Sequence, residues 1–271
     1  MNREIIRLYP EHRTLSSVRG LYLAKNLHRR GFLIYADFAT SMDGRIAVKR
    51  DGRDTLPAGL TSREDLRLLL ELQAQADCVV THSGYLRARA EGRLGDILRV
   101  GALDEHRDLL DWRRAQGLAP QPLVVVCSTT LDFPPPEDLE RERVWLVTGG
   151  AAEQRRVDEL RAQGYRVLTA GRERLVDGRL LAERLRAEGV GAVFLLAGPT
   201  LFESLVARRC LDELFLTVSH RFIGGADFHT MMPGLHAHDA HCLLDQRELT
   251  LVRTDQQAQW FAHFKCRYET A

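Results

Sequence analysis

The sequence predicts an α/β fold whose sheet is mixed and mostly parallel, with an antiparallel hairpin at its C-terminal end. Three observations lead to this prediction. Short apolar segments typical of buried strands alternate with helical segments over residues 32–207. Several of these strands end in turns of small or hydroxyl residues. Residues 243–252 and 259–268 instead alternate apolar and polar side chains, as antiparallel strands do.

Near the N-terminus the sequence predicts an arm followed by a central strand. Residues 1–31 are polar and irregular, and the amphipathic patch at 18–27 indicates an arm or short helix that packs on a neighbour. We expect a single domain over residues 32–271. Its first strand, 32–40, is almost entirely apolar except for Asp37, a carboxylate that is costly to bury unless it is paired or functional.

Further along, capping residues and apolar periodicity place the remaining elements. Thr61 or Ser62 caps a helix that has acidic residues in its first turn, and residues 49–61 before it are expected to form a loop. The other elements are predicted as strands over 76–81, 121–127, 144–147, 165–169 and 212–219, and helices over 103–116, 153–163 and 180–188.

Residues 190–202 form the most clearly marked strand–turn–helix unit. Gly191 to Leu196 predict a buried strand, and Pro199 is typical of a first helical turn. A helix that starts directly after a strand offers free backbone N–H groups to an anion, most often a phosphate. Gly198 would let that phosphate approach the backbone. The predicted contacts are Ala197, Gly198, Pro199, Thr200 and Leu201.

Four strands end in such turns, and in an open α/β sheet they meet at one edge. This arrangement favours an extended, phosphorylated ligand such as a dinucleotide, although neither G-x-G-x-x-G nor a P-loop motif occurs. The turns are His82-Ser83-Gly84, Ser128-Thr129-Thr130, Thr148-Gly149-Gly150 and Ala197-Gly198-Pro199.

Composition excludes several classes of function. The 38 Lys and Arg residues nearly balance the 37 Asp and Glu residues, which argues against nucleic-acid or membrane partners. The five cysteines form no C-x-x-C pair. There is no apolar run of about 18 residues and no signal-peptide pattern, so we expect a soluble cytoplasmic protein.

One group of histidines could suggest a metal. Its spacing matches no zinc motif, and we expect no metal there. The group consists of His229, His236, His238 and His241, with Asp227 and Asp239.

Several motifs together resemble the reductase domain of riboflavin biosynthesis. They are F-A-T-S-M-D-G-R-I-A (38–47), A-D-C-V-V-T-H-S-G-Y-L-R-A (76–88), A-G-P-T-L-F-E-S-L (197–205), L-D-E-L-F-L (211–216) and I-G-G (223–225). The resemblance implies a dihydrofolate-reductase-like three-layer sandwich, NADPH as cofactor, and a homodimer. It implies reduction of the ribosyl group of a phosphorylated aminopyrimidine to a ribityl chain. The zinc deaminase fused to many members is absent, since neither H-x-E nor P-C-x-x-C occurs.

The resemblance also implies roles for individual residues. Asp37 stands where many members have a substrate-facing lysine, and Leu196 stands where they have a glutamate. The predicted catalytic residues are Asp37, Ser41 and Asp43, and the predicted substrate contacts are Asp37, Ser41, Arg87 and Glu203. The predicted cofactor contacts are Gly44, His82, Ser83, Gly84, Ser128, Thr148, Gly149, Ala197, Gly198, Pro199, Thr200 and Leu201.

Two other functions stay open at this point. A reductase of dihydrofolate or another pterin fits Asp37, because a carboxylate can bind a 2-amino heterocycle. A non-catalytic nucleotide-binding protein would keep the phosphate turns and lose the substrate residues.

Overall fold

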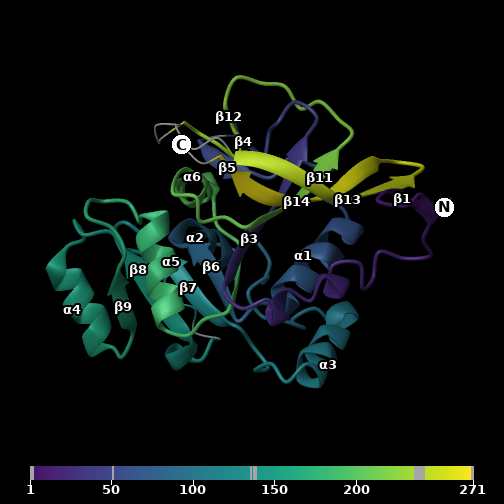
Figure 1. The fold of residues 1–271 in the computed structure, drawn as a ribbon. Coiled ribbons are helices and arrows are strands. Elements are labelled where there is room, and N and C mark those ends of the chain that lie inside the picture. The colour runs from purple at the N-terminus through teal and green to yellow at the C-terminus, as the bar shows by residue number, and fades with distance from the viewer. Residues whose placement is uncertain (1–2, 51, 135, 137–138, 235–241, 270–271) are drawn as a thin grey trace.

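A single 11-stranded sheet forms the centre of the molecule (Figure 1). The structure is a computed structural model and describes residues 3–50, 52–134, 136, 139–234 and 242–269. In sheet order the strands are β2 (Arg13–Thr14), β1 (Arg3–Tyr9), β13 (Cys242–Thr254), β14 (Ala258–Tyr268), β11 (Glu213–Ser219), β3 (Leu33–Ser41), β10 (Ala192–Leu195), β6 (Cys78–His82), β7 (Leu123–Cys127), β8 (Val144–Thr148) and β9 (Arg166–Thr169).

The sheet is mixed, as predicted. All pairings from β11 to β9 are parallel, whereas β14, β13, β1 and β2 extend the sheet with antiparallel pairings. The C-terminal hairpin β13–β14 is therefore confirmed. Strand β3 lies at the centre, with Ala36 opposite Leu195 of β10 and Asp37 opposite Phe215 of β11.

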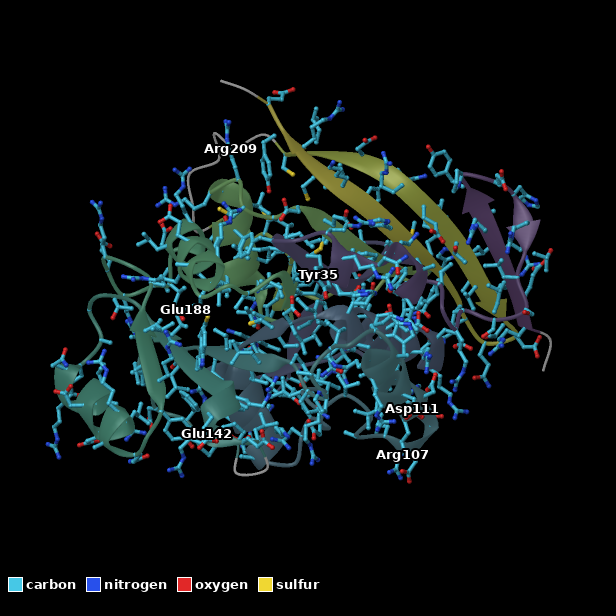
Figure 2. The ribbon with its side chains drawn as sticks, turned by 60° about the horizontal axis from the view of Figure 1, so that its bottom comes forward. Tyr35, Arg107, Asp111, Glu142, Glu188 and Arg209 are labelled. Atoms are coloured by element: carbon cyan, nitrogen blue, oxygen red, sulfur yellow. The ribbon has the colours of Figure 1, made fainter. Side chains whose placement is uncertain are left out.

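Helices cover both faces of the sheet and give the three layers. One face buries apolar residues of α1 (Arg63–Gln75), α2 (Ser83–Ala90) and α4 (Gln154–Ala162), and α3 (Asp108–Ala115) packs against α1. The other face buries residues of α5 (Gly178–Ala187) and α6 (Pro199–Ala207). Neighbouring residues of β3 point to opposite faces, so Tyr35 joins the first core and Ala36 the second. Figure 2 shows Tyr35 deep in the molecule and the labelled charged residues at its periphery.

Two helix starts predicted from sequence, the cap at Ser62 and the first turn at Pro199, are present in the structure. The Ser62 side chain accepts a hydrogen bond from the backbone N–H of Asp65 and so begins α1. Asp177 caps α5 in the same way. Pro199 occupies the first turn of α6, directly after the extended Gly198.

The N-terminal segment differs from the expected arm. Residues 3–9 form β1, which pairs with β13 from Arg3 opposite Thr254 onward. The patch at 18–27 contains one single-turn 3-10 helix, Leu23–Lys25, and the start of a second, Leu27–Arg29. Tyr22, which precedes the first helix, and Leu27 are buried in the main core. Only Ile5 of β1 is buried, so the strand leaves no alternating pattern in the sequence. The domain boundary at residue 31 stays a prediction.

A small second sheet lies beside the carboxyl end of β3. It consists of β12 (Phe228–His229), β4 (Ala47–Arg50) and β5 (Arg53–Thr55), so the loop expected over 49–61 contains a strand. Strands of two to four residues are too short to show periodicity. Among the described residues, no helix is long and apolar enough to cross a bilayer.

Candidate active site

A cavity of about 450 Å³ opens at the carboxyl ends of β3, β6 and β10, which are neighbours in the sheet. Asp37, His82, Ala197 and Gly198 line it from these strand ends. Ligands of open α/β sheets bind at this edge, so the cavity is the candidate active site. The other lining residues are Arg53, Asp54, Gly84, Tyr85, Arg87, Ala88, Glu91, Arg93, Leu94, Ile97 and Leu196.

Two of the four predicted phosphate turns meet in this cavity. The turn after β6 leads directly into α2, and the turn after β10 leads into α6. Helix geometry leaves the first N–H groups of α6 without an intrahelical partner, and Pro199 has no N–H to offer. Thr200 and Leu201 therefore carry the free donors at this helix start.

The other two turns lie further along the sheet edge and do not line the cavity. Ser128 is buried, and its hydroxyl accepts a hydrogen bond from the N–H of Leu131. Thr148 is buried as well. A side chain at Gly149 would lie 2.2 Å from the carbonyl oxygen of Glu173, so packing against that loop explains this glycine without a ligand. Contacts of Ser128, Thr148 and Gly149 with a cofactor stay a prediction.

The His82 ring lies between the two turns that meet. A Cβ atom at Gly84 would be 2.8 Å from the ring Nδ1, and one at Gly198 would be 3.7 Å from the ring Nε2. The first distance excludes a side chain at Gly84 unless His82 moves. The second is ordinary contact, so the protein itself leaves room for a side chain at Gly198.

Asp37 points from the middle of the sheet into the cavity and is partly buried. Burial raises the pKa of this carboxyl well above its usual range, and the charge of Asp65 raises it further. Asp65 is itself buried in the first turn of α1, where burial raises its pKa to about 6. Both causes favour the protonated form of the Asp37 carboxyl, which can act as a proton donor.

The predicted loop residues Ser41 and Asp43 form an anchor beside the cavity. The Ser41 hydroxyl donates to one oxygen of Asp43 at 2.5 Å, and Arg45 pairs with the other. The backbone N–H groups of Ile223 and Gly224 donate to the same carboxylate at 3.2 and 3.0 Å. These hydrogen bonds, with that from Ser41 as the largest cause, hold the pKa of Asp43 far below its usual range.

This anchor joins two of the sequence motifs, 38–47 and 223–225. Gly44 makes the tight turn possible, because its backbone has a φ of +79°. None of Ser41, Asp43 and Gly44 lines the cavity. Their catalytic, substrate and cofactor contacts stay predictions, and the structure adds a role in fixing the loop.

Arg87 and Glu203 differ in their access to the cavity. Arg87 is exposed, lines the cavity, and donates to the carbonyl oxygen of Asp132 at 2.9 Å. Glu203 is fully buried in α6 and does not line the cavity. Of these two residues Arg87 is the one that reaches the cavity, and the substrate contacts of both stay predictions.

Sequence reasoning missed several cavity residues. Arg53 and Asp54 lie on β5, within the expected loop, and Arg93 lies after α2. Asp65 was expected to be an acidic residue in a first helical turn, where carboxylates are usually solvated. Only the packing of α1 over β3 and β11 makes it a buried neighbour of Asp37.

The histidine group is only partly described. The His229 Nε2 lies 2.8 Å from Asp54 Oδ1, and the backbone of Asp227 pairs with Lys49. His236, His238, Asp239 and His241 lie outside the described residues. Among the residues that the structure describes, no three possible ligands gather into a metal site.

Chelation is accordingly expected to leave the protein unchanged. Treatment with EDTA should alter neither the melting temperature nor the binding of a nicotinamide cofactor, because we assign no metal to the histidine group. A stoichiometric metal in the purified protein that disappears in His236→Ala/His238→Ala would contradict this prediction.

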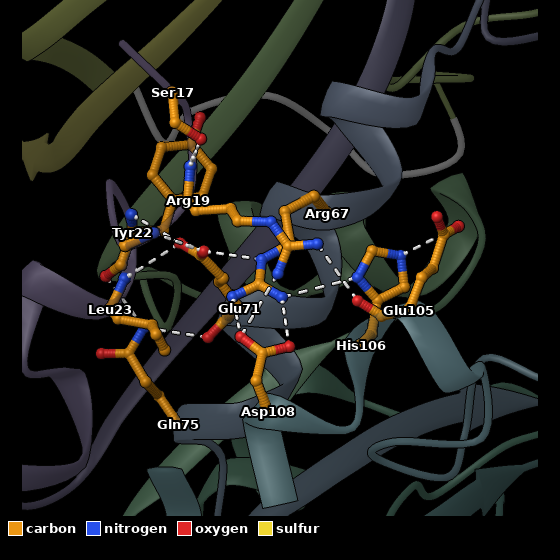
Figure 3. A network of polar contacts seen from close by, with 11 residues as sticks. Ser17, Arg19, Tyr22, Leu23, Arg67, Glu71, Gln75, Glu105, His106 and Asp108 are labelled. Atoms are coloured by element: carbon orange, nitrogen blue, oxygen red, sulfur yellow. Dashed lines mark hydrogen bonds and ion pairs between the residues drawn. The ribbon is translucent and has the colours of Figure 1, made fainter. Parts of the chain in front are cut away.

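A second hollow of about 800 Å³ lies elsewhere, between the N-terminal segment, the start of α1 and the turn from β13 to β14. Beneath it is a buried polar network (Figure 3). Arg67 donates from Nε to Glu71 and from both terminal nitrogens to Asp108 at 2.7–2.8 Å. Glu71 also accepts from the backbone N–H groups of Gly20 and Tyr22. The network ties the N-terminal segment to α1 and includes none of the predicted site residues.

Comparison with known proteins places these features in a family. The sequence model of the RibD C-terminal domain matches residues 33–258. Two curated relatives are named 2,5-diamino-6-ribosylamino-4(3H)-pyrimidinone 5′-phosphate reductase. The one from Archaeoglobus fulgidus is 27% identical over 203 residues, 74% of this chain and 86% of its own length. The one from Methanothermobacter thermautotrophicus is 28% identical over 198 residues, which are 72% of this chain and 81% of its own length.

A solved structure agrees with this assignment. The crystal structure of a pyrimidine reductase-like protein from Corynebacterium diphtheriae superposes with a TM-score of 0.69 and 18% identity, covering 88% of this chain and 92% of that one. At this identity the likeness shows the fold alone. The fold class implied by the sequence motifs, the dihydrofolate-reductase-like one, is confirmed.

Proposed function

Because the chain belongs to the RibD C-terminal domain family, we propose that it is an NADPH-dependent reductase of a pyrimidine ribosyl phosphate. The family match over residues 33–258 is the observation that carries this proposal. The names of the two archaeal relatives support the substrate class. The reaction would reduce the ribosyl group to a ribityl chain, as in riboflavin biosynthesis.

The residues of the cavity fit a nicotinamide cofactor. The free N–H groups of Thr200 and Leu201 suit a pyrophosphate, and Gly198 leaves the space in front of them open. Arg53, Arg87 and Arg93 line the same cavity and supply positive charge. When bound, NADPH would supply a hydride, and the protein would orient the substrate and exclude water.

The remaining chemistry falls to Asp37 and the arginines. A carboxyl whose pKa is raised can donate its proton to the ribosyl ring oxygen as the ring opens. Arg87 suits the 5′-phosphate of the substrate, because a guanidinium binds phosphate oxygens in pairs. The Ser41–Asp43 anchor would keep the neighbouring loop in place.

Asp37 also favours a second candidate, the reduction of a dihydropterin. An acidic residue can bind the 2-amino group and ring nitrogen of a pterin, and Asp37 lines the same cavity as Gly198. A non-catalytic nucleotide-binding protein remains the alternative from another class.

One assay separates the three candidates. The protein is mixed with NADPH and either the aminopyrimidine ribosyl phosphate or dihydrofolate, and the loss of NADPH absorbance is followed. We expect turnover of the pyrimidine. Turnover of dihydrofolate alone would favour the pterin reductase, and binding of NADPH without oxidation by either substrate would favour the non-catalytic protein.

Cofactor binding gives a separate prediction. At about 100 times its dissociation constant, NADPH should stabilise the protein by about 2.7 kcal/mol. For a domain of this size that raises the melting temperature by roughly 5–10 °C. Gly198→Leu should abolish the rise, because the leucine side chain occupies the space in front of the α6 donors.

Gly95→Ala is the matched control for this measurement. Gly95, like Gly198, has no positive φ and has room for a Cβ atom, but it does not line the cavity. It should keep the full rise with NADPH. If Gly198→Leu folds and is stabilised by NADPH as strongly as Gly95→Ala, the anion site does not lie at the start of α6.

Assembly and location are further parts of the proposal. We propose a homodimer that works in the cytoplasm, as the family resemblance implies. Met42, Phe222 and Phe228 are exposed near the Ser41–Asp43 anchor, with Phe222 81% exposed, and a second copy could cover them. Sedimentation equilibrium would measure the oligomeric state.

A further inference from the structure

The position of His82 has a consequence beyond cofactor binding. Its ring lies between Gly84 and Gly198, at the starts of α2 and α6, and lines the candidate active site. Neither ring nitrogen of His82 forms a hydrogen bond with another of the described residues. An imidazole at this place lies against Gly198, the residue directly before α6, where we place the cofactor phosphates.

The surroundings of His82 keep it neutral while the cavity is empty. Burial lowers the pKa of the imidazole, and the nearby Arg87 lowers it further, whereas Asp54 acts weakly in the opposite direction. The other charged groups that face the cavity are Asp37 from β3, Arg53 from β5, and Glu91 and Arg93 after α2. The raised pKa of Asp37 favours its uncharged form.

A phosphate at the start of α6 would change this balance. Its negative charge would lie beside the ring and favour the imidazolium. Both ring nitrogens of an imidazolium donate hydrogen bonds, whereas neutral imidazole has one donor. By linkage, a group that gains a proton on binding makes the affinity rise as pH falls. The rise ends below the pKa of His82 in the free protein, because there the proton is already present.

We propose that His82 takes up a proton when the cofactor phosphates bind between α2 and α6, so that this protein binds nicotinamide dinucleotides more tightly as the pH falls. This inference rests on the proposed function for the place of the phosphates. It goes further by assigning to His82 a proton-linked role in cofactor affinity. A single substitution at His82 should therefore abolish the link between proton uptake and cofactor binding.

Calorimetric titration with NADPH tests the coupling directly. Binding is measured between about pH 6 and pH 8 for the wild type and for His82→Gln, which keeps a hydrogen-bond donor but binds no proton. Wild-type affinity should rise on acidification by up to about tenfold per pH unit more than that of the variant. Titrations in two buffers of different ionisation enthalpy should show proton uptake that His82→Gln lacks.

The comparison of the two proteins removes other sources of protons. The 2′-phosphate of NADPH titrates near pH 6, but it does so equally with both proteins. Asp37→Asn tests whether the Asp37 carboxyl, which lines the same cavity, contributes to the proton uptake. This variant should keep the proton uptake that depends on His82. His82→Asn serves as a second variant if His82→Gln folds poorly by circular dichroism.

The outcomes distinguish the inference from the function on which it rests. Equal pH dependence and equal proton uptake in wild type and His82→Gln would overturn the role of His82 and leave the cofactor site intact. If neither protein binds NADPH at any pH, the proposed function falls and takes this inference with it. Uptake that is present in the wild type and lost in both His82 variants would support the proposal.

Discussion

Glu71→Ala is expected to destabilise the protein by about 3–5 kcal/mol, the cost of breaking a buried ion pair by removing one partner. Glu71 is fully buried, and its two oxygens accept from Arg67 Nε at 2.9 Å and from backbone N–H groups of the N-terminal segment at 2.6–3.4 Å. The variant leaves Arg67, itself only 4% exposed, with Asp108 and His106 as its partners. Denaturation in urea would measure the loss.

Asp111→Ala is the control for this prediction. It also removes a helical carboxylate that pairs with an arginine, Arg114, but both side chains are more than 70% exposed. An exposed pair of this kind contributes about 1 kcal/mol or less. If Glu71→Ala costs no more than Asp111→Ala, the network of Figure 3 does not hold the N-terminal segment onto α1.

Asp37→Asn is expected to reduce kcat/KM for the pyrimidine or pterin substrate by roughly 10- to 100-fold while leaving NADPH affinity almost unchanged. As the Asp37 carboxyl gives up its proton, its hydrogen bond to the substrate becomes charge-assisted, and losing such a bond costs on the order of 1.5–3 kcal/mol, which corresponds to that range. Asparagine has nearly the same shape as the protonated carboxyl but cannot give up a proton. Steady-state kinetics and NADPH titration would measure the two effects.

The pH profile distinguishes catalysis from structure in this variant. The Asp37 pKa is raised, and the protonated form is the active one, so wild-type kcat/KM should fall as the pH rises through that pKa. Asp37→Asn should lack this alkaline limb. A variant that is less stable but has normal turnover per folded molecule would make Asp37 a structural residue.

Asp65→Asn provides the matched test of the neighbouring carboxyl. Removing its charge should lower the pKa of Asp37, because that charge is one cause of the rise. The alkaline limb should then move to lower pH while the rate at acidic pH stays close to wild type. An unchanged limb would show that burial alone sets the titration of Asp37.

Local signals in the sequence predicted much of the fold and half of the site. The cap at Ser62, the Gly198–Pro199 helix start and the parallel strands are specified by residues that lie next to one another, and all three are present. Gly84 and Gly198 were predicted at one site and do line one cavity.

What sequence could not predict depends on contacts between distant residues. β1 shows no alternation because only Ile5 is buried, and its partner β13 is more than two hundred residues away. The partners of Asp43 lie at 223 and 224, so its anchoring role has no local signature. The closeness of Asp65 to Asp37 depends on how α1 packs over the sheet, which no spacing in the chain reveals.

The strand order also constrains how the chain can be made. β3 carries Asp37, yet its two neighbours in the sheet are β10 and β11, which a ribosome synthesises only after residue 191. β1 is synthesised first but pairs with β13, which lies near the end of the chain. A nascent chain must therefore hold this largely buried strand without partners through most of translation, and such non-local pairing folds slowly and exposes the chain to aggregation. β3 is thus among the first strands to emerge and among the last to be enclosed.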